Sequence, residues 1–444
     1  MEGRKRDAEV GSLDKPMKRE RRKPARAAAT FRAGGATAQS GGYAGAIVRR
    51  AERDEMILAM AVSGLEETEG KDGGWRGAIA VPPGSPVEKV LLAFRRETDI
   101  PLEIPFFAFL HFTSGLLLKN GSTIQGPIGR INPELWTVVL APSGSGKTWA
   151  TSILEEAAEL EALNFGEPAS GAAFLEALAD KSPALWTQDE IAQKLKQIED
   201  PKGPLAEAKE YLLRTYDNKP IERKRVRAEP VRVEKPVLGI FGLNTPESFK
   251  RALSAESVLD GFAQRFGFVY AEKDPDRPMW DFPIYDRNRV MAAAREAFEA
   301  VQENELHAEY VIGADATQAF QDAFEFLGKK RKTMPESFFR RAMFRALRYA
   351  VLYHVILGKP GNLIDAADIG WGARAVLLHL NDLGKIIGQE PEVRKETDIV
   401  GKAIQLQKEC RAAGKPFTAR VIQQRIRAVG SADQAKAIYD MVKE

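Results

Sequence analysis

The stretch ELWTVVLAPSGSGKT, residues Glu134–Thr148, contains the pattern that decides the fold class. Its apolar run Trp136–Leu140 predicts a buried strand, a glycine-containing loop follows, and helical spacing begins at Trp149. A strand, a Gly-Lys-Thr loop and a helix in this order are typical of a phosphate-binding loop, although Ala141 stands where the strict motif has glycine. We therefore expect an α/β domain; the alternative is a glycine-rich turn before an ordinary helix.

The residue types of this loop suit a nucleoside triphosphate. Glycines allow backbone N–H groups to surround an anion, and the positive end of the following helix faces the same point. Lys147 can reach the β- and γ-phosphates, and the Thr148 hydroxyl can ligate Mg²⁺. We expect ATP and Mg²⁺ as ligands. The residues expected to hold them are Ser143, Gly144, Ser145, Gly146, Lys147 and Thr148.

An acidic pair follows the next predicted strand. Ala184–Gln188 is an apolar run that ends in Asp189 and Glu190. At the end of a strand beside the phosphate loop, Asp189 would help Thr148 hold Mg²⁺, and Glu190 would act as the base that polarises the attacking water. The alternative is a pair of carboxylates that cap the start of a helix.

Two further residues stand beside predicted strands. Asn244 follows the strand Pro236–Leu243, where it could hold the lytic water or merely cap the following helix. Arg265 precedes the strand Phe266–Tyr270, where it could lie on the edge of the core, placed to reach a neighbouring subunit's nucleotide. The alternative for Arg265 is a surface arginine paired with a nearby acid such as Asp260.

Residues 219–235 predict a basic hairpin, because they contain seven basic and three acidic residues. Arg223, Arg225 and Arg227 recur at every second position, which places them on one face of a strand, and Ala228–Pro230 can form the turn. The residues expected to contact DNA are Arg223, Lys224, Arg225 and Arg227. The alternative is a solvated edge hairpin whose charges prevent aggregation.

Together these segments resemble AAA+ ATPases of the superfamily-three replicative helicase type found in phages and integrated elements. The matching segments are APSGSGKT (141–148), ALWTQDE (184–190), GIFGLNTPESF (239–249), LDGFAQRFGFVY (259–270) and SFFRRAMFRALRYAVLYHVI (337–356). The resemblance implies a ring, expected to be a hexamer, that moves single-stranded or forked DNA and works with a primase or polymerase. It also implies a second nucleotide sensor among the four arginines within residues 340–348, for which Arg341 is the candidate and the other three stay open.

Two other functions remain open from the sequence. The first is an AAA+ switch or loader that remodels a protein partner without moving along DNA. The second is a small-molecule P-loop kinase, which is disfavoured because such an enzyme needs neither Asn244 and Arg265 nor a long helical lid.

Charge and composition indicate where the protein acts. Residues 1–50 hold 13 basic and 5 acidic residues, and the remaining residues hold 52 basic and 57 acidic ones. A basic tail on a slightly acidic body favours an interaction arm. The single cysteine, Cys410, fits a reducing, cytoplasmic setting. The apolar run Ile104–Leu118 is shorter than the roughly 20 residues that a membrane span needs, so we expect no membrane contact.

Changes in composition and helical spacing predict five regions. The C-terminal one resembles a helix-turn-helix or winged-helix module, for which DNA binding, docking and packing within the ring are all open. The regions are a disordered basic tail (1–80), a helical collar (81–130), a P-loop ATPase core (131–280), a helical lid (281–392) and the C-terminal module (393–444).

Overall fold

The computed structural model describes most of the polypeptide that follows the basic tail. The described residues are 81–127, 129–225, 228–252, 261–272, 285–328, 336–388, 391–426 and 429–442. The expectation of a disordered tail over residues 1–80 falls outside them.

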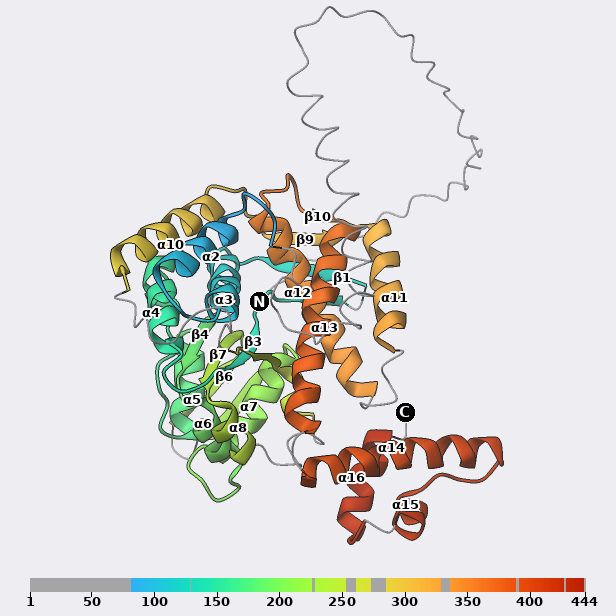
Figure 1. Ribbon diagram of the computed structural model, residues 1–444. Helices are drawn as coiled ribbons and strands as arrows, with labels where there is room; N and C mark the ends of the chain where they lie inside the picture. Colours follow the sequence, from blue (N-terminus) through green and yellow to red (C-terminus); the bar gives the residue numbers. More distant parts are fainter. Residues whose placement is uncertain are drawn as a thin grey trace, which may run out of the picture. The chain divides into compact units, whose positions relative to one another are not determined.

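Four parallel strands form the central sheet in the order β4-β7-β3-β8 (Figure 1). They are β3 (Trp136–Leu140), β4 (Ala184–Gln188), β7 (Leu238–Asn244) and β8 (Gly267–Tyr270). All residues of β3 and β7 are buried, as expected for parallel strands covered on both faces. The predicted α/β class with a parallel sheet is confirmed.

The sheet separates two hydrophobic cores. Val139 belongs to one core while Val138 and Leu140 belong to the other, because successive side chains of a strand face opposite sides. The first core includes the apolar faces of α3 (Glu103–Lys119) and α4 (Lys147–Ala158). The second includes residues of α5 (Gly171–Asp180), α6 (Ile191–Glu199), α7 (Ala206–Tyr216) and α8 (Pro246–Ala252).

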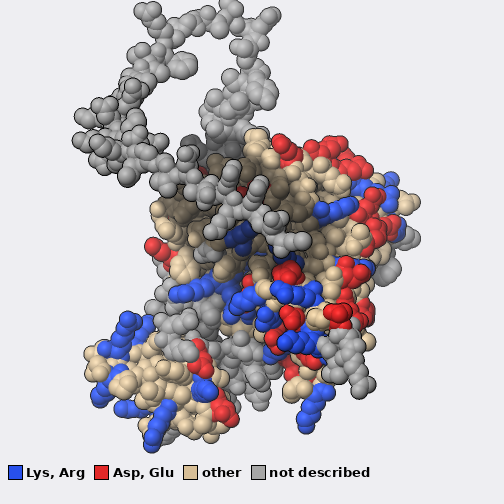
Figure 2. Space-filling model, turned by 180° about the vertical axis from the view of Figure 1, so that it is seen from behind, with Lys and Arg blue, Asp and Glu red and all other residues tan. Residues whose placement is uncertain are grey.

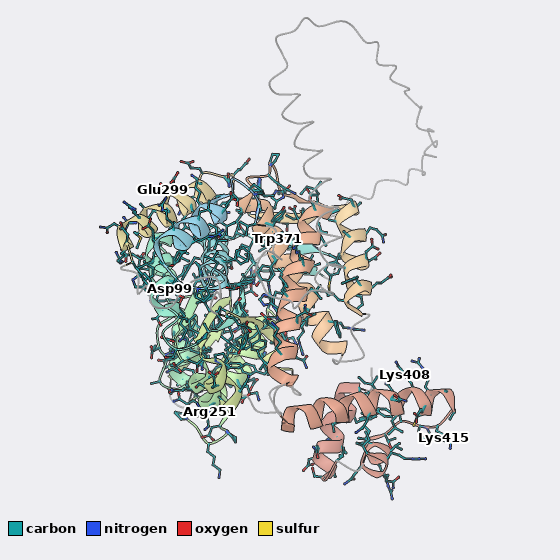
Figure 3. The ribbon with its side chains drawn as sticks, in the orientation of Figure 1. Asp99, Arg251, Glu299, Trp371, Lys408 and Lys415 are labelled. Atoms are coloured by element: carbon teal, nitrogen blue, oxygen red, sulfur yellow. The ribbon has the colours of Figure 1, made fainter. Side chains whose placement is uncertain are left out.

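Helices from both ends of the central region complete the first core. They are α2 (Pro86–Glu97), α10 (Arg287–Gln302), α11 (Ala314–Gly328), α12 (Glu336–Ile356) and α13 (Ala366–Gly388). The predicted collar and lid therefore share one core with a face of the sheet. Trp371 of α13, labelled in Figure 3, stacks its ring on that of Tyr353 of α12, with 4.8 Å between the ring centroids.

A second, mixed sheet was missed by sequence reasoning. Its order is β10-β9-β1-β2, and it combines β1 (Thr123–Gly126), β2 (Gly129–Ile131), β9 (Glu309–Ile312) and β10 (Leu363–Ile364). The segment before β3 reads as a turn-rich connection because its strands are short and interrupted by glycine. Its pairing with Glu309–Ile312, far along the sequence, leaves no local signal.

Two antiparallel strands, β5 (Ile221–Arg225) and β6 (Ala228–Val233), form the predicted hairpin. The expected turn at Ala228–Pro230 is wrong, since these residues belong to β6. The strand tolerates Pro230 because the register shifts between Arg223 and Arg225, opposite the segment that contains it, and proline is found at such irregularities.

The C-terminal module consists of α14 (Pro391–Ala412), α15 (Ala419–Arg425) and α16 (Ala432–Val442). It has a hydrophobic core of its own. That core contains Ala403, Ile422, Ile426, Val429, Ala435, Ile438 and Val442.

The structure contains two 3₁₀ turns, η1 (Glu161–Leu163) and η2 (Ala263–Arg265), within the described segments. In the part of the protein that the structure describes, no helix is both long and apolar enough to cross a bilayer.

Candidate nucleotide site

The phosphate loop lies between the carboxyl end of β3 and the first residue of α4. Gly144 and Gly146 adopt left-handed backbone angles, with φ of 72° and 74°, which a residue with a Cβ adopts only at a cost. The first turn of α4 holds no acidic residue that would repel a phosphate. The loop therefore presents backbone N–H groups and a helix N-terminus to one point.

Two polar side chains of the loop have no protein partner. Lys147 is only 9% exposed, and no ion pair or hydrogen bond to its ammonium group occurs among the described residues. The Ser145 hydroxyl is buried and has no hydrogen-bond partner. Buried polar groups are normally satisfied, so these two groups fit an anion that the loop would hold.

Asp189, which follows β4, contacts Thr148 at the start of α4 directly. Thr148 Oγ1 donates a hydrogen bond of 2.7 Å to Asp189 Oδ2, and both residues are exposed. The other Asp189 oxygen accepts from the Glu190 backbone N–H at 2.9 Å. This hydroxyl and this carboxylate are hard oxygen ligands of the kind that Mg²⁺ prefers.

No group of three or more His, Cys, Asp or Glu residues suited to a metal occurs within the described ranges. A metal at Thr148 and Asp189 would therefore take its other ligands from nucleotide phosphates and water, which is the usual arrangement for Mg²⁺.

Glu190 is held in a strained conformation with its carboxylate free. Its φ is 51°, in the left-handed region, where a non-glycine residue costs on the order of 1 kcal/mol. It occupies the N-cap position of α6, but its side chain makes no capping hydrogen bond. Nor does the carboxylate pair with any cation that the structure describes. The capping alternative for this residue is therefore not what the structure shows.

Asn244 connects the phosphate loop with the helix that follows Glu190. Its backbone carbonyl accepts from the Ala141 N–H at 3.0 Å, and its buried Oδ1 accepts from the Ala192 N–H at 3.0 Å. Asn244 thus caps α6 and not the following α8, whose first turn is bonded by Thr245. Because β4 and β7 run parallel and adjacent, their ends bring this amide beside the helix of the neighbouring strand.

Arg265 is buried and engaged by partners of its own chain, so its expected reach toward a neighbouring nucleotide stays a prediction. Arg265 is 5% exposed. Its guanidinium donates to the Asp217 carboxylate at 3.2 Å and to the Gly261 carbonyl at 2.9 Å. The partner is thus Asp217, at the end of α7, whereas Asp260 lies outside the described residues. The turn η2 directs the side chain inward, over the ring of Tyr216.

Arg341 also lies away from the phosphate loop of its own subunit. Its guanidinium donates to the Gln264 side chain and packs against Gly261. Gln264 precedes β8, which runs parallel to β3, so Arg341 lies at the amino end of the sheet while the loop lies at the carboxyl end. The sensor role expected for Arg341 therefore stays a prediction.

The hairpin arginines nearest the core are already paired. Arg223 donates to Glu207 on α7 at 3.2 Å, and Arg232 bonds Glu234 at 2.5 Å. Arg223, Glu207 and Arg232 line a cavity of about 350 Å³ with mixed charge at the base of the hairpin. Lys224 is exposed and has no ion pair among the described residues. The Arg225 side chain and Arg227 fall outside the described structure.

An apolar and aromatic wall beside the loop was missed by sequence reasoning. A Cβ at Gly146 would lie 2.6 Å from the Ile100 side chain, and the ring of Trp149 lies 4.9 Å from that of Tyr285. The Tyr285 hydroxyl donates to the carboxylate of Asp99, labelled in Figure 3. Trp149 directly follows the Gly-Lys-Thr motif and could have been suspected, but no local pattern links Asp99 with Tyr285.

We compared the chain with protein-family models, curated proteins and solved structures. No protein-family model matches the chain, and no curated protein matches it. Among solved structures, the chain is similar to a full-length MCM homolog from Methanopyrus kandleri, with a TM-score of 0.34 and 14% identity over 72% of this chain. The chain spans 61% of that structure's length. Because a TM-score of this size does not establish a common fold, the function proposed below is drawn from this protein's own residues.

Proposed function

We propose that this protein is a Mg²⁺-dependent ATPase of the AAA+ class that moves along DNA as a ring. The observation that supports the ATPase activity is the 2.7 Å hydrogen bond between Thr148 and Asp189, which joins the phosphate loop to the residue that follows β4. The next residue is Glu190, whose side chain makes no capping hydrogen bond. A glycine-rich turn of purely structural use would need neither this contact nor a free carboxylate held in a strained conformation.

The chemistry assigned to each residue follows from its position. Lys147 and the loop N–H groups bind the phosphates and offset the charge that develops as the terminal phosphoryl group leaves. Glu190 accepts the proton of the water that attacks that group. Mg²⁺, held by Thr148 and Asp189 together with phosphate oxygens, supplies Lewis-acid stabilisation when it is bound. The wall of Ile100, Trp149 and Tyr285 gives a nucleotide base an apolar surface to pack against.

Two variants test the hydrolytic site separately. Lys147→Ala should abolish ATP binding, while Glu190→Gln should keep binding and lower the hydrolysis rate by about 10²-fold or more. Binding is measured with a fluorescent ATP analogue and hydrolysis by phosphate release. Equal hydrolysis by wild type and Glu190→Gln would remove Glu190 from the mechanism.

The position of Arg341 supports sites shared between subunits. At the amino end of the sheet it is remote from its own phosphate loop, so it can meet a nucleotide only on another copy of the protein. Arg265 lies at the same end but is engaged with Asp217, so a role in trans requires that this ion pair open.

Mixing two inactive variants tests this sharing. Lys147→Ala and Arg341→Ala should each lose ATPase activity alone, whereas a mixture should recover part of it at interfaces that combine an intact loop with an intact Arg341. A mixture as inactive as its components contradicts the shared site. Native mass measurement with ATP and Mg²⁺ reports the subunit number, for which we propose six.

The exposed hairpin supports movement on DNA. Since Arg223 is neutralised by Glu207, the hairpin's contact with DNA is assigned to Lys224 and the adjoining Arg225 and Arg227. Contacts of this kind go to the phosphate backbone and are sequence-tolerant.

Charge reversal at the hairpin separates a DNA motor from a switch that acts on a protein partner. Lys224→Glu should reduce the DNA-stimulated part of the ATPase rate at least fivefold and abolish unwinding of a forked duplex. The matched control is Lys202→Glu, also exposed but in the loop between α6 and α7. Undiminished DNA stimulation in Lys224→Glu favours the switch, and unwinding by Lys147→Ala contradicts the motor.

A further inference from the structure

The exposed charges of the C-terminal module are segregated. The end of α14, the following loop and α15 present five exposed basic residues and one exposed acid, Glu409. The basic residues, here named the α14–α15 basic face, are Lys408, Arg411, Lys415, Arg420 and Arg425. Helix α16 contains two acids, Asp433 and Asp440, and one basic residue, Lys436.

The five basic side chains are free of acidic partners. None of them forms an ion pair in the described structure, and Glu409 is instead approached by the Gln405 side chain. Figure 2 shows Lys and Arg side chains along the outside of this module, and in Figure 3 the labelled Lys408 and Lys415 both extend away from its ribbon. The charge is therefore presented to solvent and is not used to hold the module together.

A tight turn fixes part of this face. Helix α14 ends at Gly414, whose φ of 62° is left-handed, and the Lys415 N–H donates to the Cys410 carbonyl at 2.8 Å. This is the hydrogen bond of a glycine-terminated helix end, which holds the loop against the last turn. Since Lys408 and Arg411 are three residues apart, they share one side of α14, and the turn holds the Lys415 backbone against the last turn of the same helix.

We infer that the α14–α15 basic face is a second nucleic-acid-binding surface, which contacts the phosphate backbone without reading sequence. In a helix-turn-helix module the later helix enters the major groove. Here that helix would be α16, whose net charge is negative, so the contact is assigned to the α14–α15 basic face instead. This surface is separate from the β5–β6 hairpin and needs no ATP.

The exposed surface of the module favours nucleic acid over a lipid membrane. A helix that lies in a membrane interface buries large apolar side chains between the lipids, in addition to any attraction of its charges to anionic headgroups. The large apolar residues that are exposed in the described structure are Leu92 and Leu363, and neither belongs to the module. Its aromatic pair, Phe417 and Tyr439, is half-buried, with ring centroids 5.6 Å apart. Exposed Gln423 and Gln424 add side-chain donors of the kind that bond phosphates.

The test measures DNA binding by the full-length protein without nucleotide. Fluorescence anisotropy with two labelled duplexes of unrelated sequence would be recorded across a series of salt concentrations. The variant Lys408→Ala/Arg411→Ala/Lys415→Ala should bind both duplexes at least tenfold more weakly. Its slope of log affinity against log salt should be shallower by roughly 0.9 for each phosphate that is no longer neutralised, about 2–3 in all.

Two controls make the result specific. Lys408→Arg/Lys415→Arg keeps the charge and should bind like wild type, and Lys436→Ala on α16 should also leave binding unchanged. Thermal unfolding of each variant verifies that the module remains folded.

The inference is overturned if the triple alanine variant keeps wild-type affinity and salt slope, or if Lys436→Ala weakens binding equally. It is also overturned if the triple variant loses binding to phosphatidylserine vesicles but not to DNA. Because these assays contain no ATP, their outcome is independent of whether Lys147 and Glu190 support hydrolysis.

Discussion

Arg348 of α12 and Glu134, two residues before β3, form an ion pair at 2.5 Å in which both side chains are 2% exposed. Arg348 also donates to the Asn132 carbonyl at 3.0 Å and lies over the Tyr216 ring. Burial raises the pKa of Glu134 to about 7, against the opposing charge of Arg348. Helix α12 is thereby attached to the segment just before β3, the strand that leads into the candidate phosphate loop.

Removing one member of the Arg348–Glu134 pair should destabilise the folded protein. Arg348→Met leaves the Glu134 carboxylate buried without its cation, which should lower the free energy of unfolding by about 3–5 kcal/mol. The double variant Glu134→Leu/Arg348→Met should recover most of that loss, because no unpaired charge remains. Urea unfolding followed by circular dichroism measures both values. A double variant no more stable than the single one contradicts an electrostatic origin.

Glu190 should show opposed effects on stability and activity. Glycine tolerates φ of 51° without strain, so Glu190→Gly should raise the unfolding free energy by about 1 kcal/mol and abolish ATP hydrolysis. Glu190→Ala serves as the matched control, since it removes the carboxylate but keeps the strain. If the two variants are equally stable, the left-handed conformation carries no cost.

Asn244 should couple the position of α6 to catalysis. Asn244→Ala leaves the buried Ala192 N–H without its acceptor, which should cost about 1–2 kcal/mol of stability. It should also lower the ATPase rate, because α6 begins directly after Glu190. Asn244→Asp keeps an acceptor for the Ala192 N–H but loses the amide that donates to the Thr245 carbonyl, so it should recover only part of the stability. Denaturant unfolding and phosphate release report the two effects, and an unchanged ATPase rate in Asn244→Ala would contradict the coupling.

Acid should destabilise the protein through His111 of α3. Its ring is fully buried without hydrogen-bond partners, and burial lowers its pKa to about 3. Between that value and the ordinary 6.5, the unfolded state binds a proton that the native state does not. Stability therefore falls as the pH drops below 6.5, by about 1.4 kcal/mol at pH 5.5.

The variant His111→Leu isolates this contribution. Its loss of stability between pH 7.5 and pH 5.5 should be smaller than that of wild type by about 1.4 kcal/mol. Burial also lowers the pKa of His379, which remains in both proteins and contributes equally to both. Urea unfolding at the two pH values measures the difference, and identical pH dependence in the two proteins contradicts a buried neutral His111.

The residues of the proposed hydrolytic site could be predicted from the sequence because they follow two buried strands. Trp136–Leu140 and Ala184–Gln188 are strands with the predicted bounds, and the carboxyl ends of parallel strands lie at one edge of a sheet. Lys147, Thr148 and Asp189 are therefore expected at the same edge. The contact between Thr148 and Asp189 depends on the tertiary structure, since β7 lies between β3 and β4 in the sheet.

What the sequence by itself determined was thus the α/β class, the two strand ends and the residue types that meet there, since these depend on local periodicity and glycine conformation. The partners of buried side chains were decided only by tertiary structure. Arg265 pairs with Asp217, Arg223 pairs with Glu207, and Asn244 accepts a hydrogen bond from α6. Each of these contacts joins segments that are far apart in the sequence. Periodicity places a residue on a face of its own element, but only packing between elements decides which opposite charge or free N–H lies within hydrogen-bond distance.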